Sequence, residues 1–227
     1  MTKMVRVLSV LLILVAMAAA PASAQDEKRV NFSIGGGYTF ALSDIRDYLG
    51  DGYNVNLGLT FNVTPVLGIQ AEYSFNGLGE KQLDVPGAEV PLFANMNMQY
   101  GNFNVVIKPP VEGKARPYVV AGMGVYYRPV KVTTPSVGYV PPYCSPWYYY
   151  CWPGGLVPVD LILTEGSSTD FGIDFGGGVT FQASEAVGIF FEARYHYIFG
   201  PELKDASGAP QGKANGQFLP ITFGLRF

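Results

Sequence analysis

The chain of 227 residues contains few of the side chains on which catalytic and metal sites usually depend. It has one histidine, His196, and two cysteines, Cys144 and Cys151, a set that fits no zinc-site spacing. Only 15% of the residues are charged, and the 18 acidic residues outnumber the 15 basic ones. A nucleic-acid-binding domain needs a basic face, which this balance does not provide. We therefore expect no metal, no cofactor and no nucleic-acid partner.

A long apolar run occurs only near the N-terminus. Two basic residues precede an apolar stretch from Val7 to Ala20, and the small residues Ala22 to Ala24 follow it. This order is typical of a secretory signal peptide. The apolar stretch is shorter than the about 20 residues that a membrane-spanning helix needs. We therefore expect a signal peptide over residues 1–24 and one exported domain over residues 25–227.

The chain is instead rich in aromatic residues (14%) and in glycine, and its side chains alternate in character. Near the C-terminus every second residue is large and apolar, namely Leu219, Ile221, Phe223, Leu225 and Phe227. Because side chains alternate between the two faces of a strand, this segment has one apolar face. A strand that ends the chain on an aromatic residue suits the closing strand of a barrel in lipid, where every backbone group must be paired.

The same period of two residues predicts seven further strands. They cover residues 30–40, 53–61, 67–75, 95–108, 115–127, 171–181 and 187–199. In most of them the polar residues share one face, which we expect to line a polar barrel interior. After Tyr100 the apolar set shifts by one position, which predicts a β-bulge near Gly101. The fifth segment is apolar on both faces, so its facing stays unassigned.

Long and short connections alternate between these strands. The long ones cover about residues 42–52, 76–94, 128–168 and 200–214, and we expect loops there, the third of them irregular. In outer-membrane barrels the short turns face the periplasm and the long loops face outward. The predicted fold class is therefore all-β, an eight-stranded antiparallel transmembrane β-barrel with both termini on the periplasmic side. The competing architecture is a secreted lipocalin-like barrel, whose apolar face would point inward.

Three segments carry a family resemblance beyond the strand pattern. They are SIGGGYTF at Ser33–Phe40, RPYVVAGMGV at Arg116–Val125 and LPITFGLRF at Leu219–Phe227. With the eight alternating strands, they resemble the outer-membrane β-barrel domain family, which includes the OmpA-, OmpX- and OmpW-like barrels of Gram-negative bacteria. The resemblance implies a location in the bacterial outer membrane, with outer-membrane lipid, lipopolysaccharide and the outer-membrane assembly machinery as partners. It also implies that alternating terminal residues act as an assembly signal, here Phe223, Leu225 and Phe227.

Several predicted inward positions carry charged or titratable side chains. These are Glu72, Asp174, Glu192, Arg194, His196 and Arg226. An isolated charge inside a narrow lumen is costly, so we expect these groups to pair in a polar network that plugs the lumen. The alternative is a selectivity ring in a small pore, since rings of charged side chains also select ions.

His196 is the residue that raises the possibility of an enzyme. Lipid A deacylases, which are also outer-membrane barrels, carry a serine nucleophile two residues after such a histidine, but Ile198 occupies that position here. A nucleophile must lie within hydrogen-bonding reach of its base. The glycine runs Gly35–Gly37 and Gly176–Gly178 lack the helix start or Lys-Ser/Thr that follows a phosphate-binding loop. We therefore expect no catalytic residues and no enzymatic activity.

The third long connection is the most distinctive segment of the chain. Cys144 and Cys151 are expected to form a disulfide, because the domain is predicted to be exported to an oxidising compartment. Five aromatic residues lie between or beside them and are candidates for recognition, namely Trp147, Tyr148, Tyr149, Tyr150 and Trp152. Tyrosine and tryptophan on a rigid scaffold offer contact area at a low entropic cost. The alternative is an aromatic collar that packs on the barrel mouth or on lipid headgroups.

These features predict a structural and surface-interacting role for the barrel. It would contribute to envelope integrity and to adhesion or recognition, with a possible surface ligand bound by the third external loop. The second hypothesis is a small porin or OmpW-like channel for small or hydrophobic solutes. In that case Phe190, Ile198 and Phe218 would form an apolar lumen wall.

The terminal strand provides a test of the barrel assignment. We expect a Phe227→Ala variant to fail mainly in membrane assembly, because the terminal aromatic residue belongs to the implied assembly signal. The fraction of folded, membrane-inserted protein in cells measures this effect, with Gln217→Ala in the same strand as a control. Normal insertion of Phe227→Ala, with loss of a surface activity alone, would contradict the assignment.

Overall fold

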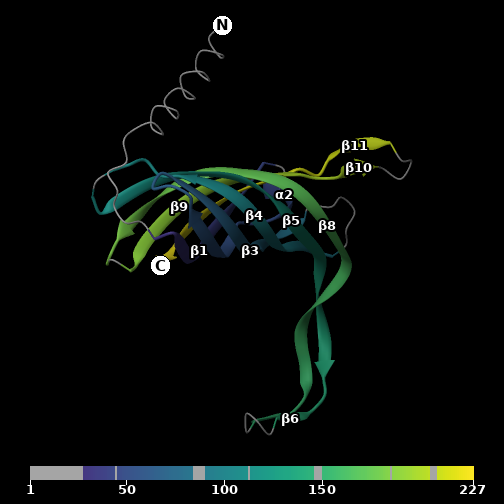
Figure 1. Ribbon diagram of the computed structural model, residues 1–227. Helices are drawn as coiled ribbons and strands as arrows, with labels where there is room; N and C mark the ends of the chain where they lie inside the picture. The colour runs from purple at the N-terminus through teal and green to yellow at the C-terminus, as the bar shows by residue number, and fades with distance from the viewer. Residues whose placement is uncertain are drawn as a thin grey trace.

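Eight antiparallel strands form the body of the molecule and pair in a ring in the computed structural model (Figure 1). The structure describes residues 28–43, 45–83, 90–111, 113–145, 150–184, 186–204 and 209–227. The predicted signal peptide therefore lies outside the described residues. The all-β fold class and the antiparallel eight-stranded barrel are confirmed.

Each strand pairs with its neighbour in the chain. In order, the barrel strands are β1 (Val30–Leu42), β2 (Gly52–Asn62), β3 (Leu67–Leu83), β4 (Leu92–Ile107), β5 (Ala115–Val140), β8 (Gly155–Gln182), β9 (Gly188–Phe199) and β12 (Gly216–Arg226). The last strand then pairs with the first, from Ser33 opposite Arg226 to Leu42 opposite Gln217. Every barrel strand therefore has a neighbour on both sides, as lipid requires of a spanning sheet.

The predicted alternation is present in the wall of the barrel. In β2, for example, Val55, Leu57 and Leu59 are exposed on the outside, whereas Asn54 and Asn56 are buried in the lumen. A water-soluble barrel would have its apolar side chains on the inside. This wall has the polarity of a barrel surrounded by lipid, with apolar residues outward and polar residues inward.

Two details of the strands differ from the expectation. The predicted bulge near Gly101 is wrong, because β3 and β4 pair without a shift through Ser74–Tyr100 and Tyr73–Gly101. Met98 and Tyr100 are buried in the lumen on the same face as Asn102. The apparent slip arises because the outer part of the lumen is apolar, so apolar and polar inward residues follow one another along one strand.

The facing of β5 is resolved by the same comparison of burial. Tyr118, Val120 and Tyr126 are buried in the lumen, whereas Met123 and Val125 are exposed on the outside. Both faces are apolar because the inward residues of β5 belong to apolar clusters, one of them formed with Val106.

The third connection is a paired extension of the barrel, so the prediction of an irregular stretch over residues 128–168 is wrong. β5 has 26 residues and β8 has 28, and they pair as far as Val140 opposite Gly155. We call the part from Thr134 to Leu161 the arm. At its base the register shifts after Val132, where β8 carries the extra residue Leu163. Such a bulge bends and twists a ribbon.

The other long connections also contain regular structure. Residues 76–94 are largely taken up by the ends of β3 and β4. The first connection holds the short helix α2 (Ile45–Tyr48), and the fourth holds the hairpin of β10 (Glu202–Lys204) and β11 (Pro210–Lys213). Within the described part of the chain, no helix has the length and apolar character to cross a membrane.

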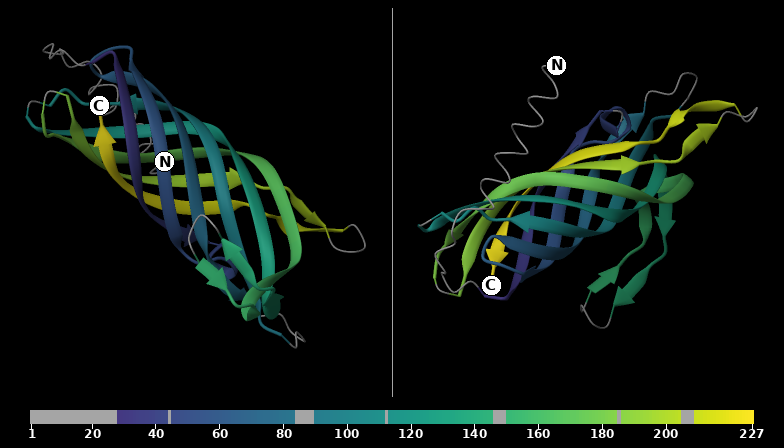
Figure 2. Two further views of the ribbon diagram at one scale, coloured as in Figure 1. Left: turned by 90° about the horizontal axis from the view of Figure 1, so that it is seen from below. Right: turned by 45° about the horizontal axis from the view of Figure 1, so that its top comes forward.

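The two ends of the barrel differ in shape (Figures 1 and 2). The C-terminus and the short turns lie at one end. At the other end the β10–β11 hairpin continues outward, roughly along the barrel. The arm leaves that same end sideways, so that its tip stands away from the barrel mouth and beside the barrel. The arm tip carries β6 (Tyr143–Ser145) paired with β7 (Tyr150–Trp152).

Candidate functional site

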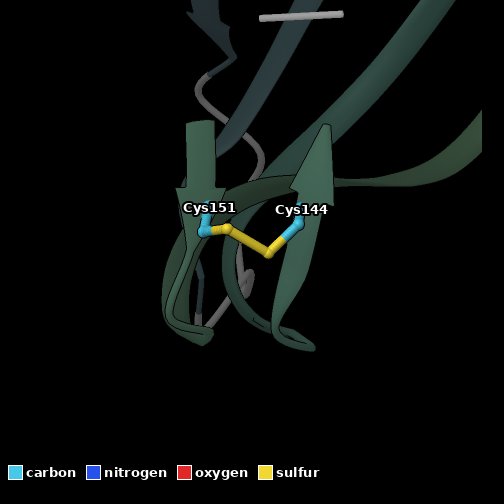
Figure 3. Close-up of a disulfide and its surroundings, with 2 residues drawn as sticks. All are labelled: Cys144 and Cys151. Carbon is cyan, nitrogen blue, oxygen red and sulfur yellow. A yellow bond between two sulfur atoms is a disulfide. The ribbon is translucent and has the colours of Figure 1, made fainter. Parts of the chain in front are cut away.

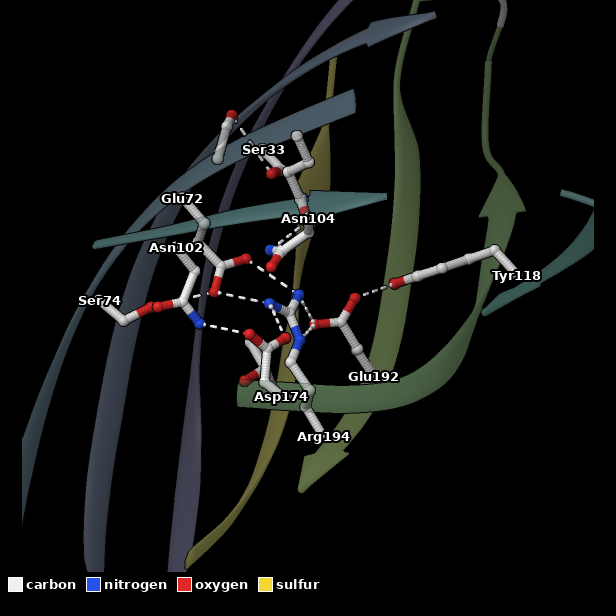
Figure 4. A network of polar contacts seen from close by, with 12 residues as sticks. Ser33, Glu72, Ser74, Asn102, Asn104, Tyr118, Asp174, Glu192 and Arg194 are labelled. Carbon is white, nitrogen blue, oxygen red and sulfur yellow. Dashed lines mark hydrogen bonds and ion pairs between the residues drawn. The ribbon is translucent and has the colours of Figure 1, made fainter. Parts of the chain in front are cut away.

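A single guanidinium, that of Arg194 on β9, is the centre of a charged cluster in the lumen (Figure 4). Its Nη1 and Nη2 atoms donate to the two carboxylate oxygens of Glu72 at 3.1 and 3.0 Å. Nε and Nη2 donate to Oε1 of Glu192 at 3.1 and 2.5 Å, and Nη1 lies 3.5 Å from Oδ2 of Asp174. The Arg194 side chain is only 2% exposed. Three carboxylates thus share one buried cation.

Each of the three carboxylates also accepts a hydrogen bond from a neutral side chain. Ser74 donates to Glu72 at 3.1 Å, Tyr118 donates to Glu192 at 2.8 Å, and Asn102 donates to Asp174 at 2.7 Å. These donors lie on β3, β5 and β4, while the charged residues lie on β3, β8 and β9. The cluster therefore connects strands around most of the lumen, and these neutral donors add hydrogen bonds to carboxylates that share one guanidinium.

The glycine run of β8 provides the space for this cluster. Gly176 is opposite Arg194 and Gly178 is opposite Glu192 in the β8–β9 pairing. A Cβ atom on Gly176 would lie 2.3 Å from the carbonyl oxygen of Ala193, and one on Gly178 would lie 2.7 Å from the Tyr118 hydroxyl. These glycines are thus close-approach positions beside the large polar side chains of the lumen.

An aromatic layer covers the charged cluster on its outer side. His196 stacks on Phe218 with ring centroids 4.5 Å apart, and Tyr100 stacks on Tyr126 at 4.8 Å. The Tyr126 hydroxyl lies 2.9 Å from Nδ1 of His196 and accepts a hydrogen bond from Asn102 at 3.1 Å. Asn102 therefore joins the aromatic layer to the charged cluster.

Aliphatic side chains fill the lumen beyond the aromatic layer. Ile45 and Leu49, in and just after α2, pack with Met96 and Met98 of β4 and with other buried residues. The short helix therefore contributes directly to the contents of the barrel mouth. At the rim, Arg128 pairs with Asp170 at 2.5 Å and donates to the carbonyl oxygen of Ala214 at 3.2 Å.

The structure brings four of the six predicted lumen residues together, namely Glu72, Asp174, Glu192 and Arg194. His196 lies in the aromatic layer, next to the cluster. Arg226 lies apart, nearer the end of the barrel that carries the C-terminus, where it donates to the Thr180 hydroxyl at 2.9 Å. Its guanidinium also lies over the ring of Tyr118, 4.8 Å from the centroid, so Arg226 contacts a hydroxyl and a ring face rather than the charged cluster.

Sequence reasoning missed the neutral members of the lumen site. The sequence pattern places Tyr100 on the outer face and does not assign Tyr118 and Tyr126, because strands β4 and β5 carry apolar residues on both faces. In β4, Asn102 and Asn104 are the residues from which the inward face could have been predicted. Polar residues two positions apart fix the inward face of β4, and extending that period backward places Tyr100 in the lumen.

Two further observations bear on chemistry in the described residues. The described residues contain no group of three or more His, Cys, Asp or Glu side chains placed to hold a metal ion. Among the described residues, the hydroxyl within hydrogen-bonding distance of the His196 ring is that of Tyr126. Ile198, which occupies the position of the deacylase serine, is buried.

The predicted disulfide between Cys144 and Cys151 is confirmed (Figure 3). It joins β6 to β7 at the arm tip, where Tyr143 is opposite Trp152 and Ser145 is opposite Tyr150. A hollow of about 640 Å³ at the tip is lined by Val140, Pro141, Tyr143, Ser145, Tyr150 and Trp152. The other recognition candidates, Trp147, Tyr148 and Tyr149, lie outside the described residues.

The C-terminal residue, Phe227, pairs with the first strand at the end of the barrel that carries the short turns. The backbone N–H of Phe227 donates to the carbonyl of Phe32 at 2.8 Å, and the N–H of Phe32 donates back at 3.2 Å. Phe223, Leu225 and Phe227 are all exposed on the outer face. The implied assembly signal is therefore a row of apolar side chains on the face that meets lipid.

A closed antiparallel barrel with an apolar outside and a polar, filled inside defines a β-barrel integral membrane protein. The chain belongs to the outer membrane protein β-barrel domain family, whose family model matches residues 10–227. The family places the protein among bacterial outer-membrane proteins. The resemblance to this family is confirmed.

Solved structures agree with this fold. Neisserial surface protein A is 12% identical, with a TM-score of 0.53 over 88% of this chain and 96% of that one. A major outer membrane protein from Thermus thermophilus is 11% identical, with a TM-score of 0.51 over 88% of this chain and 99% of that one. At these identities the similarity shows the fold alone. A comparison with curated proteins finds no match.

The charged cluster predicts a large loss of stability when its cation is removed. An Arg194→Met variant leaves three buried carboxylates without their counter-charge, and we expect it to lower the free energy of unfolding by about 3–5 kcal/mol. An Arg194→Lys variant, which keeps the charge, should lose less. Reversible urea unfolding in lipid vesicles measures both values. A loss below about 1 kcal/mol for Arg194→Met would contradict this description of the cluster.

Proposed function

We propose that the protein is a non-conducting and non-enzymatic outer-membrane barrel that acts at the cell surface through its arm. The barrel contributes to envelope integrity and serves as a rigid base. The arm serves adhesion or recognition. The observation that carries this proposal is the contrast between a lumen filled with mutually bonded side chains and an arm whose apolar side chains are exposed.

The filled lumen supports the non-conducting part of the proposal. Charged, aromatic and aliphatic layers follow one another from the centre of the barrel to its outer mouth. Eight strands enclose an interior that side chains are large enough to fill. A selectivity ring would keep its charges hydrated and available to ions, whereas Arg194 directs its guanidinium at three protein carboxylates.

The surroundings of His196 support the non-enzymatic part. Its Nδ1 is engaged by Tyr126 and its ring is stacked on Phe218. A histidine in this position orders the aromatic layer and joins it to the charged cluster.

Export and assembly follow from the same proposal. Residues 1–24 would direct the chain out of the cytoplasm and be removed. The terminal row of Phe223, Leu225 and Phe227 would engage the outer-membrane assembly machinery. The finished barrel would sit among outer-membrane lipid and lipopolysaccharide.

A channel for small or hydrophobic solutes is the second candidate. It is favoured by the buried apolar side chains of Phe190, Ile198 and Phe218, which lie in the lumen as a channel wall would. Phe218 is stacked on His196, however, and Ile198 packs in the same cluster as Met98. These contacts support a filled interior over an open path.

Planar-bilayer recording distinguishes a plug from a pore. We expect the refolded wild-type barrel to show no steady conductance at low voltage, because the charged and aromatic layers fill the lumen. A Tyr126→Ala/Phe218→Ala variant, which removes two rings of the aromatic layer, serves as the comparison and should conduct more than the wild type. Discrete, steady openings of the wild-type protein would contradict the proposal and support the channel.

Removal of the arm tests the surface role. Thr133 is opposite Ile162, so residues 134–161 can be replaced by a two-residue Asn-Gly turn. We expect this variant to fold and insert like the wild type but to lose surface binding or adhesion. The matched control removes β10–β11 between Pro201 and Ala214, whose backbone groups are hydrogen-bonded at 2.9 Å. Unchanged surface binding and membrane integrity without the arm would contradict the proposal.

A further inference from the structure

The arm exposes apolar side chains on both of its faces. Tyr139 is opposite Leu156, and with Val137 these residues form one face, where they are 67%, 75% and 67% exposed. Val159 and Leu161, opposite Ser136 and Thr134, lie on the other face and are 40% and 53% exposed. A single flat protein partner would cover one face and leave the other in water.

The arm offers little charge to an ionic partner. Asp160 is the one charged residue between Val132 and Leu163. At the arm base, charges of opposite sign face each other across β5 and β8: Arg128 pairs with Asp170 at 2.5 Å, and Lys131 with Glu165 at 3.7 Å. The driving force for any association of the arm is therefore apolar contact, which salt does not screen.

The backbone edges of the arm are poorly suited to strand addition. β4 pairs with β5 as far as Thr133, and β9 pairs with β8 only from Phe171 onward. Beyond these points each arm strand contains a proline, Pro135 in β5 and Pro158 in β8. A proline has no N–H to donate to a ladder, and prolines on edge strands oppose edge-to-edge pairing. The arm's side chains are therefore better placed than its backbone to make contacts.

The direction and the tip of the arm indicate what covers it. Because the barrel axis crosses the membrane, an arm that leaves the outer end sideways runs along the membrane surface (Figures 1 and 2). The tip exposes Tyr143, Tyr150 and Trp152. Tyrosine and tryptophan are enriched at the membrane–water interface, where one part of the ring system is in apolar surroundings and the polar group is hydrated.

We propose that the arm lies in the interfacial zone of the outer leaflet of the protein's own membrane and anchors the barrel laterally. The lipid contact rests on the proposed function, in which the arm is the interacting surface of the protein. It names membrane lipid as the partner of that surface. Lipid at this depth contacts both faces of the ribbon. The unpaired backbone edges limit the depth, because open sheet edges are not tolerated in the hydrocarbon core. The arm is therefore a surface anchor and does not span the membrane.

The positions of the tryptophans provide a direct readout. The chain has two, Trp147 and Trp152, and both lie between the two arm strands in sequence. A Trp147→Phe variant leaves Trp152 as the sole tryptophan. In phosphatidylcholine nanodiscs we expect its emission to be blue-shifted relative to tryptophan in water. Lipids brominated near the headgroup end of the acyl chain should remove most of the emission, and lipids brominated near the chain terminus much less.

Paired variants on the Trp147→Phe background control for the arm surface. Val137→Asp/Leu156→Asp should lose most of the quenching, whereas Val137→Ile/Leu156→Met should retain it. Gel mobility before and after heating verifies that the barrel of each variant is folded. The quenching should also be the same in low and high salt, since the contact is apolar.

Two results would overturn the proposal. Water-like emission with no quenching by brominated lipid would show that Trp152 is in solvent. A blue shift that appears only in nanodiscs with two barrels would show that a second copy covers the arm. Either result leaves the conductance and arm-deletion outcomes unaffected, so failure of the lipid contact is distinguishable from failure of the proposed function.

Discussion

The buried guanidinium of Arg194 is the interaction on which the rest of the lumen depends. In lipid the barrel exterior offers no partner to a polar group, so charged side chains must be satisfied within the lumen. Arg194 meets this requirement with Glu72, Asp174 and Glu192. The carboxylates in turn need donors from β3, β4 and β5, and the adjacent strand needs glycine at 176 and 178. One charge thus determines residue choices on five of the eight strands.

The two ends of the lumen are closed by different means. Outward from the charged cluster, Asn102 connects to Tyr126 and His196, and aliphatic side chains from α2 and β4 cover these rings. Toward the end with the short turns, Arg226 lies over the rings of Tyr118 and Phe190. The barrel is therefore a rigid body with a packed interior. A rigid body of this kind suits the display of a long two-stranded arm, which on its own would be marginally stable in water.

The sequence predicts the wall of the barrel well because most strands place polar and apolar residues on opposite faces. β1 and β2 follow this rule, and so does β12 apart from Phe218, so their alternation predicts the facing that the structure has. The same period predicts the inward charged residues, four of which pair with one another as expected. It does not predict their neutral partners, because contacts across a lumen depend on the height of each residue in the barrel, which alternation does not specify.

The failures occur where both faces of a strand are apolar. Met98 and Tyr100 are inward because the outer lumen has an apolar core, so a rule of polar residues inside reads them as outward. The prolines of the arm and its apolar residues on both faces hide the period of two, so the sequence pattern there indicates an irregular stretch where the structure has paired strands. In the fold, the arm strands are the ends of β5 and β8, and they continue the pairing that these strands have in the barrel wall.

A double-mutant cycle between Arg194 and Glu72 tests the central claim most directly. Free energies of unfolding in lipid vesicles are needed for the wild type, Arg194→Met, Glu72→Gln and the double variant. A cohesive plug predicts a coupling free energy of about 1–3 kcal/mol, because the two side chains share two hydrogen bonds and are both buried. A coupling below about 0.5 kcal/mol would show that the charges are separately hydrated, as in a pore, and would contradict the account.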